Sequence, residues 1–492
     1  TRDGRILQRP FGGHTYPRLA HVGDRTGLEL IRTLQDRSVA VGAQVYQEVI
    51  ITRLSTKDGV VNGAIGYSRI DGAPVAFPAK AVVLASGGVG RAFAVTSNSW
   101  ESSGDGQGLA YRTGAEFIDM EFVQFHPTGM VHPAGVKGLL VTEAVRGEGG
   151  ILRNSEGKRF MWDYLPEARR DEYAATDDEA RAWVDDLTEG RQSSHRRPPE
   201  LSTRDNVARA IYTEVMEGRG SPHGGVFLGF SYLPAERVRA KLPSMYEQFK
   251  ELADVDITAG PMEVGPTMHY IMGGIKVDAE VGETTTPGLF AAGEVAAGLH
   301  GSNRLGGNSL TDLLVFGRRA GEAAAETAAS TKPVEALDPA FVEESVAAMY
   351  APFERESGED PNALHAELQA TMSSLVGIFR VADDLERAIA RIDGFKQRWH
   401  ELRVTGPRRF NPAWDLVFEL RNMLVVAEAI ARSALERQES RGAHSRLDYV
   451  GLQDGWDQVN VHTHRDGDAM VVEQRPVVEL PTELATHVEK KG

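Results

Sequence analysis

Apolar runs separated by turn residues predict strands near the start of the chain. Residues 39–90 contain several runs rich in Val, Ile and Tyr, and Asp-Gly pairs divide them, which is typical of strands joined by tight turns. The last run, AVVL at 81–84, leads directly into small residues. A short apolar run of this kind indicates a buried strand whose end approaches a ligand.

A different period governs residues 336–442. Apolar residues recur there at three- and four-residue steps, which predicts a bundle of three or four helices. The last of these helices is expected to end at Gly442, because glycine commonly follows a helix C-terminus. The remaining residues, 443–492, have the pattern of short strands and loops.

The middle of the chain is mixed. Residues 122–268 include a charged, proline-containing stretch at 166–201, which predicts a solvated insertion. Residues 274–330 then return to a strand, a glycine-rich loop and a helix. The whole pattern favours an α/β protein with a helical region toward its C-terminus.

Composition excludes several classes of function. The 492 residues contain no cysteine, so this chain forms no disulfide, uses no thiolate nucleophile and binds no iron–sulfur cluster through cysteine. The formal net charge of −16 argues against nucleic acid or an anionic membrane surface as a direct partner. No apolar run is long enough to predict a membrane-spanning helix. An anionic substrate is not excluded, because a local cluster of arginines can make the electrostatic potential positive at one site.

Two glycine-rich loops are weak candidates for a nucleotide site. Ser86, Gly87 and Gly88 follow the AVVL strand, but without a complete fingerprint they indicate only a turn. Asp105 lies in a Gly-Asp-Gly turn that opens a helix. Its carboxylate can either accept hydrogen bonds from sugar hydroxyls or cap the helix, and the sequence leaves both interpretations open.

A third loop is more informative. A predicted strand, GLFAAG, ends at Glu294, where the edge of an α/β sheet binds ligands and a carboxylate can hold ribose or ribityl hydroxyls. The loop HGSNRLGGNSL at 300–310 follows and leads into a helix. The amides of Ser309 and Leu310 at that helix N-terminus can stabilise an electron-rich carbonyl or an anion, and Arg304 can reach an anion.

Polar side chains that stand in apolar or glycine-rich surroundings form a second candidate set: His126, Thr142, Glu143, Arg146, Arg204 and His269. Each alone is more often structural than catalytic. Together with Arg304 they suit a small dicarboxylate, because arginine binds carboxylates with two parallel hydrogen bonds and His and Thr donate more. The HTH triplet at 462–464 has poor spacing for a metal, its strand context suggests exposure, and we expect no metal site.

Ten motifs stand in a fixed order along the chain: QRPFGGH, ASGG, GDG, EFVQFHPTGM, LVTEAVRGEGG, STRDNVARAI, GPTMHYIMGG, GLFAAGE, HGSNRLGGNSLTDLLVFGRRAG and ESRGAHSRLDY. In these motifs the chain resembles the flavoprotein subunit of succinate dehydrogenase and fumarate reductase. The resemblance runs from about residue 3 to beyond residue 450.

The resemblance implies an α/β fold with a Rossmann-like FAD-binding domain interrupted by an α+β capping domain. It divides the chain into 1–121 and 269–335 for the two parts of the FAD-binding domain, 122–268 for the capping (substrate) domain, 336–442 for the helical bundle and 443–492 for a small C-terminal domain. The family's N-terminal G-x-G-x-x-G segment has no counterpart here, so we expect a preceding piece of the FAD site to lie outside this sequence.

The resemblance also implies roles for single residues. Arg204 is the acid/base residue, with Glu143 and Arg146 relaying protons. The dicarboxylate contacts His126, Thr142, His269, Arg304 and Phe11. FAD contacts Asp105, Glu294, Ser309, Leu310, Ser86, Gly87 and Gly88. FAD is expected to be covalent, through a histidine in the absent N-terminal segment, and His14 is interpreted as a loop residue that does not carry the flavin.

The implied activity is hydride transfer from succinate to FAD, with Arg204 taking the second proton, so that fumarate forms. Electrons then pass to a separate iron–sulfur subunit and to quinone, with membrane anchor subunits of respiratory complex II as further partners. The implied location is the cytoplasmic face of the inner (plasma) membrane, peripheral and held by those subunits. Alternatives are fumarate reductase working in reverse, a soluble L-aspartate oxidase-like enzyme, and a non-catalytic flavin-family scaffold.

Overall fold

The computed structural model describes residues 4, 6–9, 14, 18–189, 191 and 193–485. Two parallel strands, β6 (Val82–Leu84) and β13 (Leu289–Ala291), bring segments about 200 residues apart to one sheet edge. Helix α8 (Asn308–Ser330) packs against this pair through Phe290, Ala320 and Ala324. The loops after both strands therefore emerge together. The predicted strand at 81–84 is confirmed, but its predicted burial is wrong at Val83, whose side chain is exposed.

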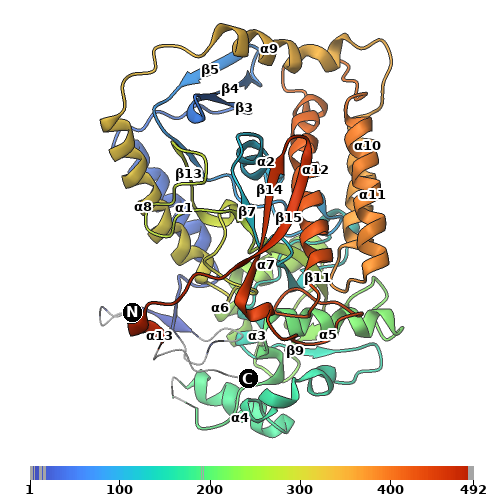
Figure 1. The fold of residues 1–492 in the computed structure, drawn as a ribbon. Coiled ribbons are helices and arrows are strands. Elements are labelled where there is room, and N and C mark those ends of the chain that lie inside the picture. The colour runs from blue at the N-terminus through green and yellow to red at the C-terminus, as the bar shows by residue number, and fades with distance from the viewer. Residues whose placement is uncertain are drawn as a thin grey trace.

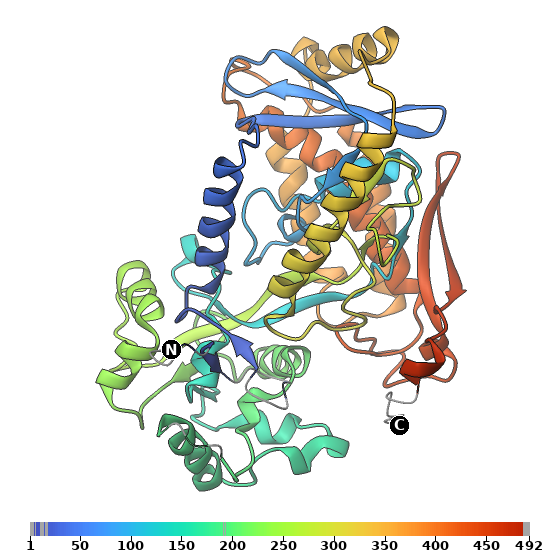
Figure 2. The ribbon, with the colours of Figure 1, turned by 90° about the vertical axis from the view of Figure 1, so that its left-hand side faces the viewer.

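An antiparallel sheet of three strands covers one end of the molecule, at the top of Figures 1 and 2. β3 (Val49–Lys57) and β4 (Val60–Ser68) are joined by Asp58 and Gly59, both with positive φ, which is the two-residue turn expected of an Asp-Gly pair. β5 (Pro74–Pro78) completes the sheet. Helix α1 (Thr26–Ala40) precedes it and α2 (Asp105–Arg112) follows, while β1 (Gln8–Arg9) pairs with β2 (Leu19–Ala20).

A second antiparallel sheet has the order β8-β11-β10-β9 and its own hydrophobic core. Its strands are β8 (Val123–Met130), β9 (Ile151–Arg153), β10 (Val226–Gly229) and β11 (Met262–Ile271). The helices of this region are α3 (Ala144–Gly147), α4 (Asp177–Thr188), α5 (Arg204–Met216), α6 (Ala235–Lys241) and α7 (Pro243–Ala253). These elements lie in the lower half of Figures 1 and 2.

The stretch 166–201 is only partly the solvated insertion that its charge pattern predicts. Much of it is exposed, but Tyr173, Glu200 and Leu201 are buried. Glu200 is buried because the guanidinium of Arg159 donates to both of its carboxylate oxygens, at 2.7 and 2.6 Å. Burying a charged group costs less free energy when an oppositely charged group is paired with it.

The predicted helices of the bundle are confirmed, and they share a core with the three-stranded sheet. They are α9 (Pro339–Glu354), α10 (Pro361–Leu375), α11 (Ala382–Trp399) and α12 (Pro412–Glu436), of which the last three run alongside one another in Figure 1. The predicted end at Gly442 is wrong, because α12 ends at Glu436. Gly442 instead lies in a tight turn at φ 54°, where its backbone approaches Ser302 so closely that a Cβ would lie 2.4 Å from the Ser302 carbonyl oxygen.

The C-terminal residues form a hairpin of β14 (Val459–Asp466) and β15 (Ala469–Pro476), followed by α13 (Thr482–Ala485). β14 also pairs with β7 (Phe117–Ile118), which pairs with β12 (Gly274–Ile275). This pairing buries His462 and Thr463, so the expected exposure of the HTH triplet is wrong for those two residues. Among the described residues no helix is long and apolar enough to cross a membrane.

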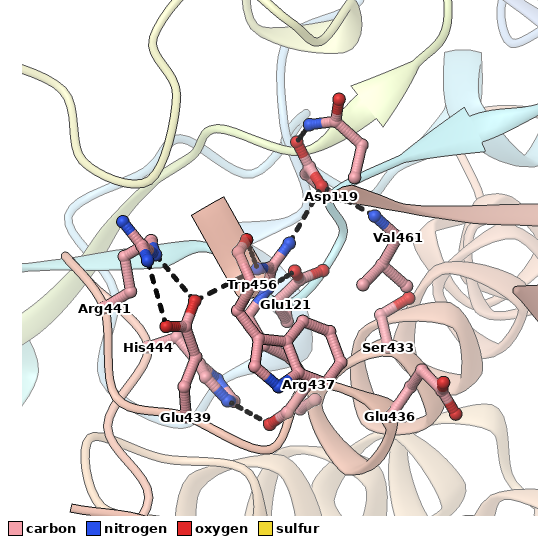
Figure 3. Close-up of polar contacts among 12 residues, drawn as sticks. Asp119, Glu121, Ser433, Glu436, Arg437, Glu439, Arg441, His444, Trp456 and Val461 are labelled. Atoms are coloured by element: carbon pink, nitrogen blue, oxygen red, sulfur yellow. Dashed lines mark hydrogen bonds and ion pairs between the residues drawn. The ribbon is translucent and has the colours of Figure 1, made fainter. Parts of the chain in front are cut away.

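A buried ionic cluster anchors this hairpin, as Figure 3 shows. Arg437, the first residue after α12, pairs with Glu121, with Asp119 at 3.4 Å and with Glu439 at 3.2 Å. Asp119 in turn accepts the amide of Val461, on β14, at 3.0 Å. We call Asp119, Glu121, Arg437 and Glu439 the Arg437 cluster. It joins residues 119–121 to residues 437–439, directly after the end of α12, and Asp119 extends the contact to β14.

Candidate active site

Two arginines from distant segments meet at one amide. Arg204 is the first residue of α5, and Arg304 lies in the loop before α8. Gln124, on β8, accepts from Arg204 Nη1 at 3.2 Å and from Arg304 Nη2 at 3.1 Å through the same Oε1 atom. All three side chains are buried. This spacing gives two guanidinium groups that can grip one small anion.

Gln124 is a residue that the sequence-based assignment missed. It lies two positions before His126 in EFVQFHPTGM, and residues i and i+2 of a strand point to the same face. That period-2 relation was the available signal. A glutamine beside a candidate histidine carries no charge, however, so only the fold identifies its two partners.

Arg204 also contacts the candidate proton relay. Its Nε donates to Glu143 Oε2 at 2.7 Å, and Glu143 Oε1 lies 3.8 Å from Arg146 Nη2. Glu143 directly precedes α3 and Arg146 lies within it, so their i,i+3 spacing brings the two side chains together on one helical turn. Arg146 is fully buried, and burial lowers its pKa while the Glu143 carboxylate opposes that shift. Its Nη1 donates to the Glu200 carbonyl at 2.6 Å.

The two candidate histidines lie on paired strands, and their ring centroids are 5.2 Å apart. His126 on β8 pairs with Thr267 on β11, so His269, two residues further along β11, lies close to His126. The pKa of each ring lies well below its usual range, first because of burial and then because of neighbouring arginine charges. Both rings are therefore neutral at neutral pH, and each offers one N–H donor.

The ring of His126 is held by the backbone of Thr128. Its Nδ1 lies 3.1 Å from the Thr128 carbonyl oxygen, to which it can donate, and 3.2 Å from the Thr128 amide nitrogen, from which it can accept, so the tautomer depends on which of the two bonds forms. When Nδ1 accepts from the amide, the proton is on Nε2. That atom is buried and has no hydrogen-bond partner among the described residues. His269 contacts the Ser97 hydroxyl through Nδ1 at 2.8 Å.

Further unpartnered donors make the site suited to an anion. Arg304 Nε and Arg146 Nε are buried without a hydrogen-bond partner in the described part of the chain. Burial and the nearby charge of Arg204 lower the pKa of Arg304 to about 9. Buried donors left unpaired are costly, so an anionic ligand would relieve the repulsion of like charges and satisfy these atoms together.

Arg304 is also fixed by its surroundings. Its Nη1 donates to the Ser309 hydroxyl at 3.0 Å, and its guanidinium lies over the ring of Tyr270, 4.2 Å from the centroid. Thr142 is half-buried, and its hydroxyl lies 3.4 Å from the Ala144 amide nitrogen. Phe11, the remaining predicted substrate contact, lies outside the described residues.

The predicted cofactor contacts gather where β6 and β13 end. The Ser86 hydroxyl accepts the amide of Gly106 at 3.0 Å, and Glu294 accepts the amide of Ile271 at 3.0 Å. A Cβ on Gly88 would lie 2.3 Å from a carboxylate oxygen of Glu294, so any side chain at this position would require that carboxylate to move. Gly87, between Ser86 and Gly88, has a positive φ of 75°. Burial raises the pKa of Glu294 to about 7.

The side chain of Gln107, on α2, offers a second sign of a polar ligand near this edge. It is fully buried, and neither its Oε1 nor its Nε2 has a hydrogen-bond partner among the described residues. Together with the carboxylate of Glu294, this amide suits a hydroxyl-rich, flat cofactor such as FAD. The residues present therefore fit the group that the resemblance implies.

Of the two roles that its sequence context left open, Asp105 does not perform the capping role in the structure. It is the first residue of α2 and makes no capping hydrogen bond. Its two carboxylate oxygens accept from Ser103 at 2.9 Å and from Asn422, on α12, at 2.5 Å. In the structure it ties α2 to the helical bundle, and its contact with a cofactor stays a prediction.

The loop before α8 is held in place from the N-terminal side. Gly307 precedes the helix with φ 85°, and the Leu310 amide donates to its carbonyl at 3.1 Å, so that amide already has a partner. His14 lies buried against this loop, with Nε2 2.8 Å from the Gly306 carbonyl and Nδ1 accepting from Arg18 at 3.1 Å. Both of its ring nitrogens are thus engaged.

Comparisons with known protein families agree with the motif order. The model of the FAD binding domain family matches residues 1–310, and the model of the fumarate reductase flavoprotein C-terminal family matches residues 365–489.

Several relatives are similar over most of the chain. A fumarate reductase (CoM/CoB) subunit of Methanothermobacter marburgensis is 45% identical, and the match covers 92% of this chain and 76% of the relative. A fumarate reductase flavoprotein subunit of Mycobacterium tuberculosis is 37% identical, over 95% and 78%. A succinate dehydrogenase flavoprotein subunit of Rickettsia conorii is 35% identical, over 97% and 78%.

Solved structures give the same result for the fold. Sdh1 of Mycobacterium smegmatis, solved in complex with UQ1, is 49% identical with a TM-score of 0.81, covering 98% of this chain and 78% of that one. A quinol fumarate reductase of E. coli is 34% identical with a TM-score of 0.86, over 98% and 80%.

Proposed function

The chain belongs to the flavoprotein subunits of succinate dehydrogenase and fumarate reductase, and on this premise we propose that it oxidises succinate to fumarate. One observation carries the proposal: Arg204 and Arg304 converge on a single buried acceptor, beside two neutral histidines. Such a set of converging, buried donors suits a dianion with one carboxylate at each end.

We assign the grip on the substrate to Arg304, His126, His269 and Thr142. The guanidinium of Arg304 can bind one carboxylate with two parallel hydrogen bonds, and His126, in the tautomer protonated at Nε2, can donate to an oxygen of the same ligand. Because these donors are buried, each hydrogen bond to the anion acts in a medium of low dielectric and polarises the substrate strongly.

We assign proton transfer to Arg204, with Glu143 and Arg146 behind it. The Glu143 carboxylate accepts from Arg204 Nε at 2.7 Å, so a proton that Arg204 gains or gives has a hydrogen-bonded partner. A free guanidinium stays protonated, and succinate oxidation requires Arg204 to be transiently neutral.

FAD is the group that this family of domains binds, and when bound it supplies the two-electron acceptor. We propose that Ser86, Gly87, Gly88, Asp105, Glu294, Ser309 and Leu310 hold it. The close approach of Gly88 to Glu294 and the unpartnered amide of Gln107 support this assignment. We further propose a covalent link through a histidine other than His14, since both ring nitrogens of His14 are engaged.

Fumarate reduction is the second candidate. Relatives that carry the fumarate reductase name reach 45% identity, and a guanidinium that is protonated at rest is ready to donate to the developing carbanion. An L-aspartate oxidase-like activity is less well supported. It needs a carboxylate to hold the substrate ammonium, and Glu143, which lies in the site, is paired with Arg204 and Arg146.

We also propose the electron-transfer partners of this chain and its location in the cell. The electrons pass to a separate iron–sulfur subunit and then to quinone, and the chain sits peripherally at the cytoplasmic face of the inner membrane, held by anchor subunits. The similar Sdh1 structure, described with UQ1, supports a quinone-linked assembly.

We propose the same domain division as the resemblance implies. The second sheet has its own hydrophobic core, which supports a capping domain over 122–268 between FAD-binding parts 1–121 and 269–335. Residues 336–442 and 443–492 are then the helical and C-terminal domains.

The test is a pair of rates on the purified holoprotein. Succinate-dependent reduction of a dye and fumarate-dependent oxidation of a reduced low-potential dye are measured on one preparation, with L-aspartate as a third substrate. Faster succinate oxidation supports the proposed direction, and faster fumarate reduction favours the second candidate. Turnover of aspartate alone, or of none of the three, overturns the proposal.

A further inference from the structure

Asn303 connects the site to α5 through both ends of its side-chain amide. Its Oδ1 accepts from Gln124 Nε2 at 2.7 Å, and its Nδ2 donates to Asp205 Oδ1 at 2.6 Å. Asp205 follows Arg204 in the first turn of α5. Its second oxygen accepts from Arg209 Nη2 at 2.7 Å. Four side chains thus form one continuous series of hydrogen bonds, from Arg209 to Gln124.

The chemistry of the two charged ends fixes the direction of this series. A guanidinium can only donate and a carboxylate can only accept, so Asp205 must accept from both of its neighbours. Asn303 must then turn its NH₂ group toward Asp205 and its carbonyl toward Gln124. Gln124 consequently points its NH₂ group toward Asn303 and its carbonyl toward the two site arginines.

A second contact agrees with this orientation. Gln124 Nε2 also donates to the backbone carbonyl of Arg304 at 2.7 Å, so a reversed amide would set two oxygens against each other there. The loop that follows α12 supports the far end of the series. Arg209 Nη1 donates to the Gly442 carbonyl and to the Ser445 hydroxyl, both at 3.1 Å.

We propose that Asp205 and Asn303 are positioning residues for the reaction, because they orient the Gln124 amide so that its carbonyl lies between Arg204 and Arg304. Two buried guanidinium groups repel each other, and a carbonyl dipole between them offsets that repulsion. An NH₂ group in the same place would add a third positive end and drive the two arginines apart. This inference rests on the proposed function, since it assigns how the same pocket keeps its geometry.

The critical variant is Asp205→Asn. Arg209 can only donate, so the new asparagine must present its oxygen to Arg209 and its NH₂ group to Asn303. Asn303 and Gln124 must then reverse, or two like groups must face each other. We expect kcat/KM for succinate and fumarate to fall at least about tenfold, the effect of one buried hydrogen bond to a charged group. Affinity for malonate, a dicarboxylate that does not react, should fall as well.

The double variant Asp205→Asn with Asn303→Asp separates orientation from simple loss of a contact. The carboxylate at position 303 can accept from the amide at position 205 and from Gln124, so the original orientation returns although the charge has moved. We expect kcat/KM and malonate affinity to recover to within about threefold of wild type.

A matched control lies on the same helix. Glu214 is buried on α5 and accepts from Asn154 at 2.8 Å, on the side of the helix that faces away from the Gln124 series of hydrogen bonds. Glu214→Gln should lower the melting temperature and leave kcat/KM and malonate affinity unchanged.

Three results would overturn the positioning role: unchanged kinetics and malonate affinity in Asp205→Asn, equal losses in Glu214→Gln, or no recovery in the double variant. A wild-type protein that turns over neither substrate overturns the proposed function instead. In that case the malonate affinities of the same proteins, measured by calorimetry, still decide whether Asp205 and Asn303 orient Gln124.

Discussion

At the scale of single residues, Arg204 has contacts that serve two purposes. Its Nε is held by Glu143, and its Nη1 contacts the same oxygen that Arg304 uses. In our proposal, one side of the guanidinium faces the proton partner Glu143, and the other side faces the bound anion. A substitution that keeps size and polarity should separate these purposes.

We expect Arg204→Gln to lower kcat by at least about 100-fold, because the variant loses both the group that transfers the proton and a charge that stabilises the transition state. Fumarate should still bind, since Arg304 and the histidines remain. Steady-state rates together with a fumarate titration by calorimetry measure the two effects. Undiminished turnover would remove Arg204 from its acid/base role.

The contacts of Arg304 require the planar geometry of its guanidinium group. It donates to Gln124 and Ser309 at once and lies over Tyr270, and a lysine ammonium cannot make these contacts together. Arg304→Lys should therefore raise KM for succinate roughly tenfold or more, with a smaller change in kcat. The control is Arg319→Lys on α8, where the arginine is exposed and pairs with Glu280, and it should leave KM unchanged. An equal KM in both variants would contradict the assignment.

At the scale of elements, the turn after α12 supports two parts of the site. Residues 440–446 contact α5 through Arg209, and the Ala443 amide donates to the Ser302 carbonyl at 2.9 Å, two residues before Arg304. The site thus relies on backbone contact between loops that are about 140 residues apart in sequence.

Gly442→Ala tests this contact. The added Cβ would lie 2.4 Å from the Ser302 carbonyl oxygen, at a φ that alanine adopts poorly, so the loop at 300–310 must move. We expect a melting temperature lowered by several degrees, from a cost of about 1–3 kcal/mol, and a clear loss of kcat/KM. Gly451→Ala has a similar φ of 77° but nothing within 4 Å of the new Cβ, so it should lose stability alone. Similar kinetics in the two variants would contradict the contact.

At the scale of the whole molecule, the Arg437 cluster docks the C-terminal hairpin on the segment that leads into β8 (Figure 3). Glu121 is fully buried in it, and burial raises its pKa from 4.5 to about 7, although the charge of Arg437 opposes the shift. The folded protein therefore holds the Glu121 proton more tightly than the unfolded chain does.

The raised pKa of Glu121 predicts that the stability of the folded protein falls as the pH rises. Glu121 contributes no penalty below pH 4.5, where it is protonated in both states, and it costs stability as the pH rises from 4.5 through 7. Over that range the melting temperature of Glu121→Gln should fall less than that of wild type, as measured by calorimetry at several pH values. Parallel curves for the two proteins would show that Glu121 does not titrate there.

Several features follow from local sequence because their causes are local. The Asp58-Gly59 turn, the helices of the bundle and the spacing of Glu143 and Arg146 depend on backbone preferences and on short periods. The end of α12 at Glu436 was missed because its surroundings are tertiary: the next residue, Arg437, is paired with Glu121, which is more than 300 residues away in sequence. The burial of His462 was missed because strand pairing with β7 covers it.

The sequence by itself determined which chemical groups this protein has: the order of its motifs, a set of arginines and histidines suited to a dicarboxylate, and the lack of cysteine in these 492 residues. Only the tertiary structure decided that Arg204 and Arg304 meet at Gln124, and that Asn303 and Asp205 hold that amide in one orientation. The physical reason is that residue types and short periods are encoded locally, whereas hydrogen bonds between segments 80 to 180 residues apart exist only once the strands and helices have packed.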